Sequence, residues 1–120
     1  MTHAQAIVMQ LKQSLSSGDL AAARKLLRDD LSFQGPFDTF DRPEPYLEAL
    51  RRLAGVVKSV EMKRVFADGD DVCLLYEMTA DKVGTTFIAE WHHVRDGQIA
   101  AIRVVFDARP WAPLFAGKAG

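Results

Sequence analysis

The sequence predicts an α+β domain in which helices pack on one face of a curved antiparallel sheet. In the first part of the chain, apolar residues recur at helical spacing, whereas from Val56 onward they alternate at strand spacing. Short turns rich in Asp and Gly separate the strand-like runs, which is typical of strands that follow one another in both chain and sheet. With 120 residues, the chain is expected to form one domain spanning 1–120.

The first helix is predicted from His3 to Ser16, followed by a stop at Gly18 and a second helix capped by Asp19. The apolar positions of the first helix are Ile7, Val8, Leu11 and Leu15. The second helix is expected to bury Leu20, Ala23 and Leu27, and to expose Arg24, Lys25 and Arg28. A short strand at 31–33 and a turn at 34–37 follow.

The third helix is predicted to begin near Asp41 and to end at Gly55. Asp41 and Glu44 have the spacing of a capping box, and Pro43 and Pro45 are tolerated in a first turn. The apolar side of this helix comprises Tyr46, Leu47, Leu50, Leu53 and Ala54.

The remaining chain is predicted to form strands. A run at 60–66 alternates, with Val60, Met62, Arg64 and Phe66 on one side. After a turn at 67–71, the next strand places Val72, Leu74, Tyr76 and Met78 on one face. A turn at 81–84 leads to the last hairpin, Thr85 to Asp107.

The last hairpin carries the main candidate site. Glu90 interrupts an apolar strand, and His92 lies two positions further, so both side chains point to the same face. A carboxyl group and an imidazole on an apolar face predict a pocket with a titratable floor. Glu90 is the candidate acid or base, with an expected rise of its pKa by burial, and His92 and Tyr76 are the candidate assisting residues.

Two registers of the hairpin are open from the residues alone. A two-residue turn pairs Val94 with Ile99 and places Glu90 opposite Arg103, as a surface ion pair. A three-residue loop with a left-handed Gly97 pairs Val94 with Gln98 and places Glu90 on the inner face.

Composition excludes several function classes. The formal net charge of −1 gives no general attraction to nucleic acid or to anionic membranes, and no apolar run is long enough to span a membrane. The single cysteine, Cys73, and the absence of a leader pattern lead us to expect a cytoplasmic protein. Glu90 and His92 lack a third metal ligand, so neither a metal nor another cofactor is expected.

The order of elements, with the motif Phe33-Gln34-Gly35-Pro36 and the ending from Arg95 to Asp107, resembles the nuclear-transport-factor-2-like superfamily. The ending is similar to the polyketide-cyclase (SnoaL-like) branch. The resemblance implies a cone-shaped sheet with three N-terminal helices on its concave face, the bulged hairpin register, and an inward-facing Glu90. It also implies an apolar cavity lined by Phe33, Phe37, Tyr46, Met78, Ile88, Ile102, Val104 and Phe106.

The catalytic groups of known branches do not carry over. Gly35 stands where ketosteroid isomerases have their base, and Leu11 stands near the position of their oxyanion tyrosine. Only Glu90 matches a catalytic carboxyl group of those enzymes. The positions that correspond to the catalytic triad of limonene-epoxide hydrolases are occupied by Tyr76, Met78 and Val104. The resemblance therefore implies that this triad is absent. Three functions therefore remain: an enzyme that transfers protons on, or hydrates, a small apolar molecule; a binding protein for such a molecule; and an interaction module with a vestigial pocket.

The outer face of the sheet predicts a homodimer. It carries the apolar residues Phe87, Ala89, Trp91 and Val105 together with Arg103. Soluble monomers usually avoid such a strip, and family members often dimerise through this surface. The alternative is that the C-terminal segment containing Trp111, Leu114 and Phe115 covers the strip within one chain.

Overall fold

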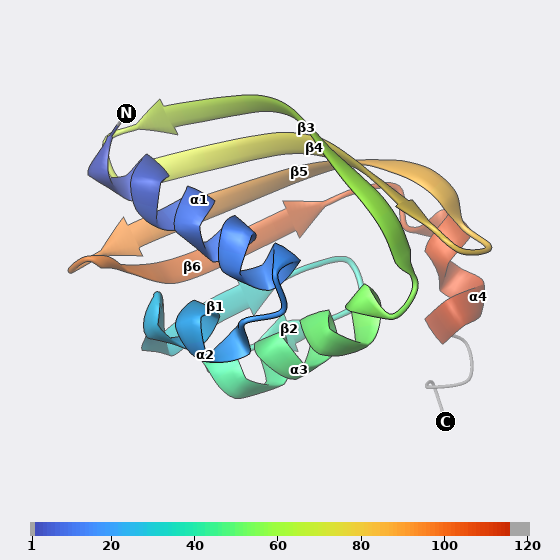
Figure 1. Cartoon of the computed structure of the whole chain (residues 1–120), viewed down its shortest axis with the longest axis horizontal. Helices are drawn as coiled ribbons and strands as arrows, with labels where there is room; N and C mark the ends of the chain where they lie inside the picture. The colour runs from blue at the N-terminus through green and yellow to red at the C-terminus, as the bar shows by residue number, and fades with distance from the viewer. Residues whose placement is uncertain (1, 116–120) are drawn as a thin grey trace.

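A six-stranded sheet forms the centre of the structure, a computed structural model that describes residues 2–115 (Figure 1). The strand order is β2-β1-β6-β5-β4-β3. The strands are β1 (Leu27–Gln34), β2 (Thr39–Phe40), β3 (Val57–Asp68), β4 (Asp71–Ala80), β5 (Gly84–Arg95) and β6 (Gln98–Val105). β1 and β6 run parallel, and all other neighbours are antiparallel. The predicted α+β class with a curved, mixed sheet is confirmed.

Three helices precede the long strands: α1 (His3–Ser16), α2 (Leu20–Lys25) and α3 (Pro43–Ala54). Figure 1 shows α1 crossing the sheet, and its contacts are with β4, β5 and β6. α2 and α3 lie beside β1. A short 3-10 turn, η1 (Arg109–Trp111), and α4 (Ala112–Phe115) follow the last strand and were not predicted. None of the helices within residues 2–115 is long and apolar enough to cross a membrane.

The ends of the first two helices follow the predicted signals. α1 spans the predicted residues, and Gly18, with φ +76°, ends it in a conformation that favours glycine. The Asp19 side chain accepts a hydrogen bond of 3.0 Å from the backbone N–H of Ala22, which confirms the predicted cap.

Two helix predictions were wrong. α2 ends at Lys25, so Leu27 and Arg28 belong to β1. This segment pairs with β6 instead of continuing the helix, and the backbone N–H of Ile99 donates to the Leu26 carbonyl oxygen at 2.8 Å. α3 begins at Pro43 without a side-chain cap, so the predicted Asp41–Glu44 capping box is absent. Glu44 instead pairs with Arg24 of α2, at 2.7 Å.

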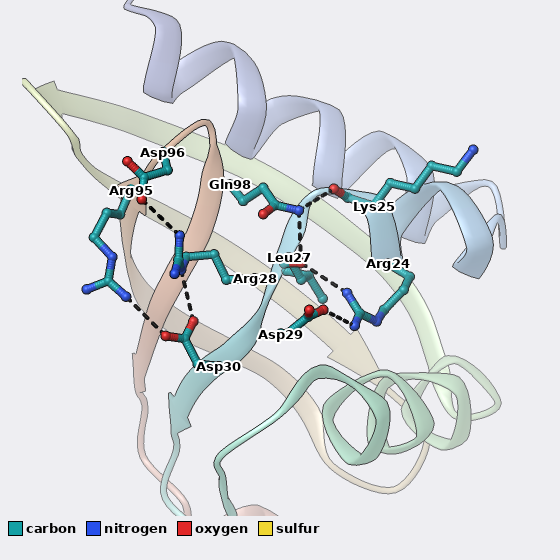
Figure 2. A network of polar contacts seen from close by, with 9 residues as sticks. All are labelled: Arg24, Lys25, Leu27, Arg28, Asp29, Asp30, Arg95, Asp96 and Gln98. Carbon is teal, nitrogen blue, oxygen red and sulfur yellow. Dashed lines mark hydrogen bonds and ion pairs between the residues drawn. The ribbon is translucent and has the colours of Figure 1, made fainter.

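The tip of the β5–β6 hairpin is fastened to β1 by the polar network in Figure 2. The Gln98 amide donates to the carbonyl oxygens of Lys25 and Leu27, at 3.0 and 3.3 Å. Arg28 pairs with Asp96, and Arg95 with Asp30, across the two strands. The ion pairs, which join β1 to Asp96 of the turn and Arg95 of β5, are exposed and contribute little stability, whereas Gln98 joins the start of β6 to the start of β1.

The hairpin closes with a two-residue turn. Asp96 and Gly97 have φ of +54° and +77°, which suits the twist of antiparallel strands. The predicted positive φ of Gly97 is confirmed. The predicted pairing of Val94 with Gln98 was wrong, because Val94 pairs with Ile99.

Glu90 nevertheless faces inward together with Leu74 of β4, and a bulge at Ala100 of β6 places Val104 rather than Arg103 beside it. Beyond this bulge His93 pairs with Ala101, and Glu90 pairs with Val104 rather than with Arg103 or Ile102. The extra residue restores the face assignment that the two-residue turn by itself would have reversed. The buried core accordingly contains Leu11, Leu27, Leu31, Leu74, Ile99 and Ile102.

The outer face of the sheet carries an uncovered apolar strip. Phe87, Trp91 and Val105 are 56%, 50% and 66% exposed. Within residues 2–115, Trp111 does not cover it, since this residue is buried on the inner side, where its indole N–H donates to the Thr86 hydroxyl at 2.8 Å. Leu114 is exposed, and the side chain of Phe115 lies outside the described part.

We propose that a second copy of the chain covers this strip, giving a homodimer through Phe87, Ala89, Trp91, Arg103 and Val105. Sedimentation at micromolar concentration should give a dimer mass for the wild type and a monomer mass for Trp91→Glu, because the new charge would be buried without a partner. The exposed α1 variant Gln13→Glu should remain dimeric. A monomeric wild type would contradict the proposal.

Candidate functional site

Glu90 lies in the core of the described structure, on the inner face of β5. It is 4% exposed and is flanked by Leu74 of β4 and Val104 of β6. A carboxyl group in this position must be paired or neutralised, because a buried isolated charge costs several kcal/mol. The polar groups around it therefore determine its chemistry.

Three side chains contact the Glu90 carboxyl group. The Tyr76 hydroxyl, from β4, donates to Oε1 at 2.6 Å. The Lys12 ammonium group, from α1, forms an ion pair with Oε2. His92 Nε2 lies 2.7 Å from the same Oε2, although its direction departs from that of a well-formed hydrogen bond. We call Lys12, Tyr76, Glu90 and His92 the inner polar cluster.

His92 is completely buried, and both of its ring nitrogens face acceptors. Nε2 faces Glu90, and Nδ1 lies 3.4 Å from the Val72 carbonyl oxygen. A neutral imidazole carries one N–H and can donate to only one of these acceptors, whereas an imidazolium can donate to both. His92 therefore lies between two acceptors, the Glu90 carboxylate and the Val72 carbonyl oxygen.

The charges of the cluster act on the carboxyl and phenol groups in opposite directions. Burial by itself raises the pKa of Glu90, but the attraction of Lys12 and His92 is larger together and holds this pKa well below its usual range. The rise expected from the sequence was therefore wrong. Burial, and then the charge of Glu90, raise the pKa of both Tyr76 and Tyr46. Near neutral pH the cluster thus combines an ionised carboxylate with the protonated phenol of Tyr76, and the phenol of Tyr46 nearby is protonated as well.

Sequence reasoning missed Lys12. The signal was present, because Val8, Leu11, Lys12 and Leu15 share the i, i+3, i+4, i+7 spacing of one helix face. A lysine inside an apolar stripe either extends to solvent or meets a buried anion. Here its side chain is 23% exposed, and its ammonium nitrogen lies 5.3 Å from the centre of the Tyr76 ring as well as against Glu90.

The predicted lining residues divide into four sets. Ile88 and Ile102 are buried core residues beside the cluster. Phe33 of β1 contacts Tyr46 of α3 with tilted rings whose centroids are 4.9 Å apart. At the C-terminal end, the ring centroid of Phe106 lies 6.4 Å from that of Phe37 and 6.0 Å from that of Trp111. The half-buried residues Met78 and Val104 complete the predicted set.

Two hollows in the described part of the structure lie elsewhere. One, of about 470 Å³, lies between α1 and α2, and the other, of about 190 Å³, lies on the outer face beside Trp91, His93 and Arg103. Neither is bordered by Glu90, whose two oxygens are instead occupied by the side chains of the cluster. Within residues 2–115, no group of three or more His, Cys, Asp or Glu residues is arranged to hold a metal ion.

The comparisons with known proteins identify a family and a widespread fold. A family model described as a SnoaL-like domain matches residues 9–102. No curated protein matches the chain. An NTF2-like protein of unknown function from Cytophaga hutchinsonii is 26% identical, with a TM-score of 0.79 over 90% of this chain and 93% of its own.

Two further solved structures share the fold at lower identity. An LEH-like epoxide hydrolase from M. tuberculosis is 24% identical, with a TM-score of 0.74 over 97% of this chain and 92% of its own. A de novo designed protein with a curved β-sheet is 23% identical, with a TM-score of 0.80 over 98% and 99%. Since an enzyme and a designed protein both have this fold, the fold alone does not assign an activity.

Proposed function

Because the chain belongs to the SnoaL-like domain family of NTF2-like proteins, we propose that it is a small-molecule pocket protein that transfers a proton on an apolar organic substrate, with Glu90 as the base. The observation that carries the proposal is the inner polar cluster. A buried carboxylate held by an ammonium group, an imidazole and a phenol costs desolvation energy, and apolar residues of similar volume would often be at least as stable. Such a group is typical of functional sites.

The balance of charges suggests how Glu90 becomes a base. In the free protein Lys12 and His92 hold the pKa of Glu90 low, so its carboxylate is a weak proton acceptor. A ligand oxygen that attracts the Lys12 ammonium would weaken this hold, while burial would continue to raise the pKa. Substrate binding would therefore increase the basicity of Glu90.

The remaining members support this step. The base takes a proton from a carbon next to a carbonyl group, and the electron pair of the broken C–H bond moves onto the carbonyl oxygen. Lys12 would stabilise this oxygen, as electrostatic preorganisation requires. Tyr76, which donates to Oε1, and His92, beside Oε2, would hold the carboxylate in place.

Exchange of α-protons tests this function without knowledge of the natural substrate. In D₂O, the wild type should accelerate deuterium incorporation into 2-decanone, followed by NMR. Glu90→Gln should lose about 100-fold or more of the acceleration, the range of general-base contributions. Glu77→Gln, a carboxylate paired with Lys63 on the other face of the sheet, is the matched control and should retain it.

A second candidate function is binding without catalysis, with a vestigial pocket as its extreme form. It is favoured by the position of the two hollows, neither of which borders Glu90. Binding of 2-decanone without accelerated exchange in the wild type, or unchanged exchange in Glu90→Gln, would favour this alternative over catalysis.

A further inference from the structure

The inner side of the edge strand β3 exposes apolar residues on the concave face. Val60 pairs with Met78, and Met62 pairs with Tyr76, so both point to the same face as the inner polar cluster. They are nevertheless 53% and 36% exposed, because the helices pack on β1, β2, β4, β5 and β6 and make no extensive contact with β3.

A bulge at Lys63 changes which residues of β3 point inward. Met62 pairs with Tyr76, whereas Arg64 pairs with Leu75, so the alternation shifts by one residue. Val65 therefore points inward and Phe66 outward, which corrects the prediction that Phe66 shares a face with Val60 and Met62. The inward apolar surface of β3 next to Tyr76 is thus formed by Val60 and Met62.

This surface leads directly to Lys12. Met62 lies opposite Tyr76 on the neighbouring strand, and the ammonium nitrogen of Lys12 lies over the Tyr76 ring. Lys12 is also the member of the cluster with the largest solvent contact: its side chain is 23% exposed, whereas that of Glu90 is 5% exposed. A ligand that lies along β3 would reach the Lys12 ammonium before the carboxylate.

The cluster retains capacity to donate to an anion. An ammonium group has three N–H donors, and the contacts of Lys12 are one Glu90 oxygen and the face of the Tyr76 ring. The remaining N–H donors of Lys12 can therefore bind a second carboxylate, the ligand's own.

We propose that the ligand is an apolar monocarboxylate, whose apolar chain lies on Val60, Met62 and Met78 and whose carboxylate binds the Lys12 ammonium. This inference rests on the proposed function and names its substrate class: the three N–H donors of Lys12 would serve Glu90, the ligand carboxylate and the carbonyl oxygen that receives the electron pair. Glu90 then acts as an internal competitor for Lys12 in the free protein, so its removal should tighten binding of the ligand while abolishing proton transfer.

Titration calorimetry with decanoate and 1-decanol tests the proposal, because the two probes share their apolar chain length and differ in charge. The wild type should bind decanoate at least about ten-fold more tightly than decanol. Glu90→Gln should bind decanoate about ten-fold more tightly than the wild type, since the competing carboxylate is gone. The double variant Lys12→Met/Glu90→Gln, which leaves no unpaired buried charge at these two positions, should lose the preference for decanoate.

Two variants of β3 test where the apolar chain of the ligand lies. Met62→Glu should weaken decanoate binding about ten-fold or more, because it places a negative charge on the apolar surface. Phe66→Glu, on the opposite face of β3, should leave it unchanged. A change of sedimentation mass in Met62→Glu would instead show that another copy covers this face, and would overturn the proposal.

Two results would overturn the anionic class itself: equal affinity of the wild type for the two probes, or an undiminished preference for decanoate in the double variant. Neither result affects the exchange assay with 2-decanone, which tests proton transfer separately. Conversely, Glu90→Gln that loses exchange but does not gain affinity for decanoate would keep Glu90 as the base and overturn its role as a competitor.

Discussion

Lys12→Met should destabilise the protein by roughly 3–5 kcal/mol, because it leaves the Glu90 carboxylate buried with a reduced set of partners. Methionine preserves much of the length and apolar volume of lysine, so the loss would report charge rather than packing. Urea denaturation at neutral pH measures the free energy of unfolding. Lys25→Met, at an exposed lysine of α2, is the control and should change it by less than about 0.5 kcal/mol.

The charge origin of this loss can be separated from a loss of contacts. The double variant Lys12→Met/Glu90→Gln should recover most of the stability, because no carboxylate then remains to be compensated. The loss in Lys12→Met should also shrink in acid, where Glu90 can neutralise by protonation. Lys12→Met with wild-type stability would show that Lys12 is dispensable to the buried carboxylate.

The second large effect is a loss of stability in acid. The pKa of Glu90 is lowered in the folded state below its ordinary value of 4.5, so the unfolded chain binds the proton more readily than the folded chain. The contribution of the ionised Glu90 is therefore fully present above the unfolded pKa and is lost as the pH falls toward the folded pKa. The free energy of unfolding should decrease from about pH 5 downward.

Two variants test whether Glu90 causes this decrease in the free energy of unfolding at low pH. Glu90→Gln should show a shallower dependence on pH between about pH 5 and about pH 2, because its amide does not titrate. Glu48→Gln removes a carboxylate whose pKa is also lowered, by Arg51, but at an exposed site where solvent screens the pair. Its pH dependence should remain close to that of the wild type. Identical profiles for Glu90→Gln and the wild type would contradict the assignment.

For Glu90, the sequence predicts which residues share its face of the strand, but not which residue lies opposite it on the next strand. The alternation of residues along β5 correctly places Glu90 and His92 together, because side-chain direction within a strand has a fixed period of two. The partner of Glu90 across the hairpin was not determined, since it depends on both the turn and a bulge. The Asp96–Gly97 turn shifts the register in one direction, and the bulge at Ala100 compensates for it.

The members of the cluster show the same division. Glu90, His92 and Tyr76 were predicted because strand periodicity places each of them on an inner face. Lys12 was missed because its contact with Glu90 joins residues far apart in the sequence, on a helix and a strand. Without Lys12, the expected pKa shift of Glu90 had the wrong sign, because burial alone raises the pKa of a carboxyl group.

The sequence by itself determined the α+β class, the limits of α1, the Asp19 cap, and which residues of β4 and of β5 share a face. These features depend on local periodicity and on residues near one another in the chain. Only the tertiary structure decided that Leu27 begins a strand, that the bulge at Ala100 places Val104 beside Glu90, and that Lys12 reaches the carboxylate. Each of these depends on how distant segments pair and pack, because the free energy of a buried charge is set by the groups that surround it in space.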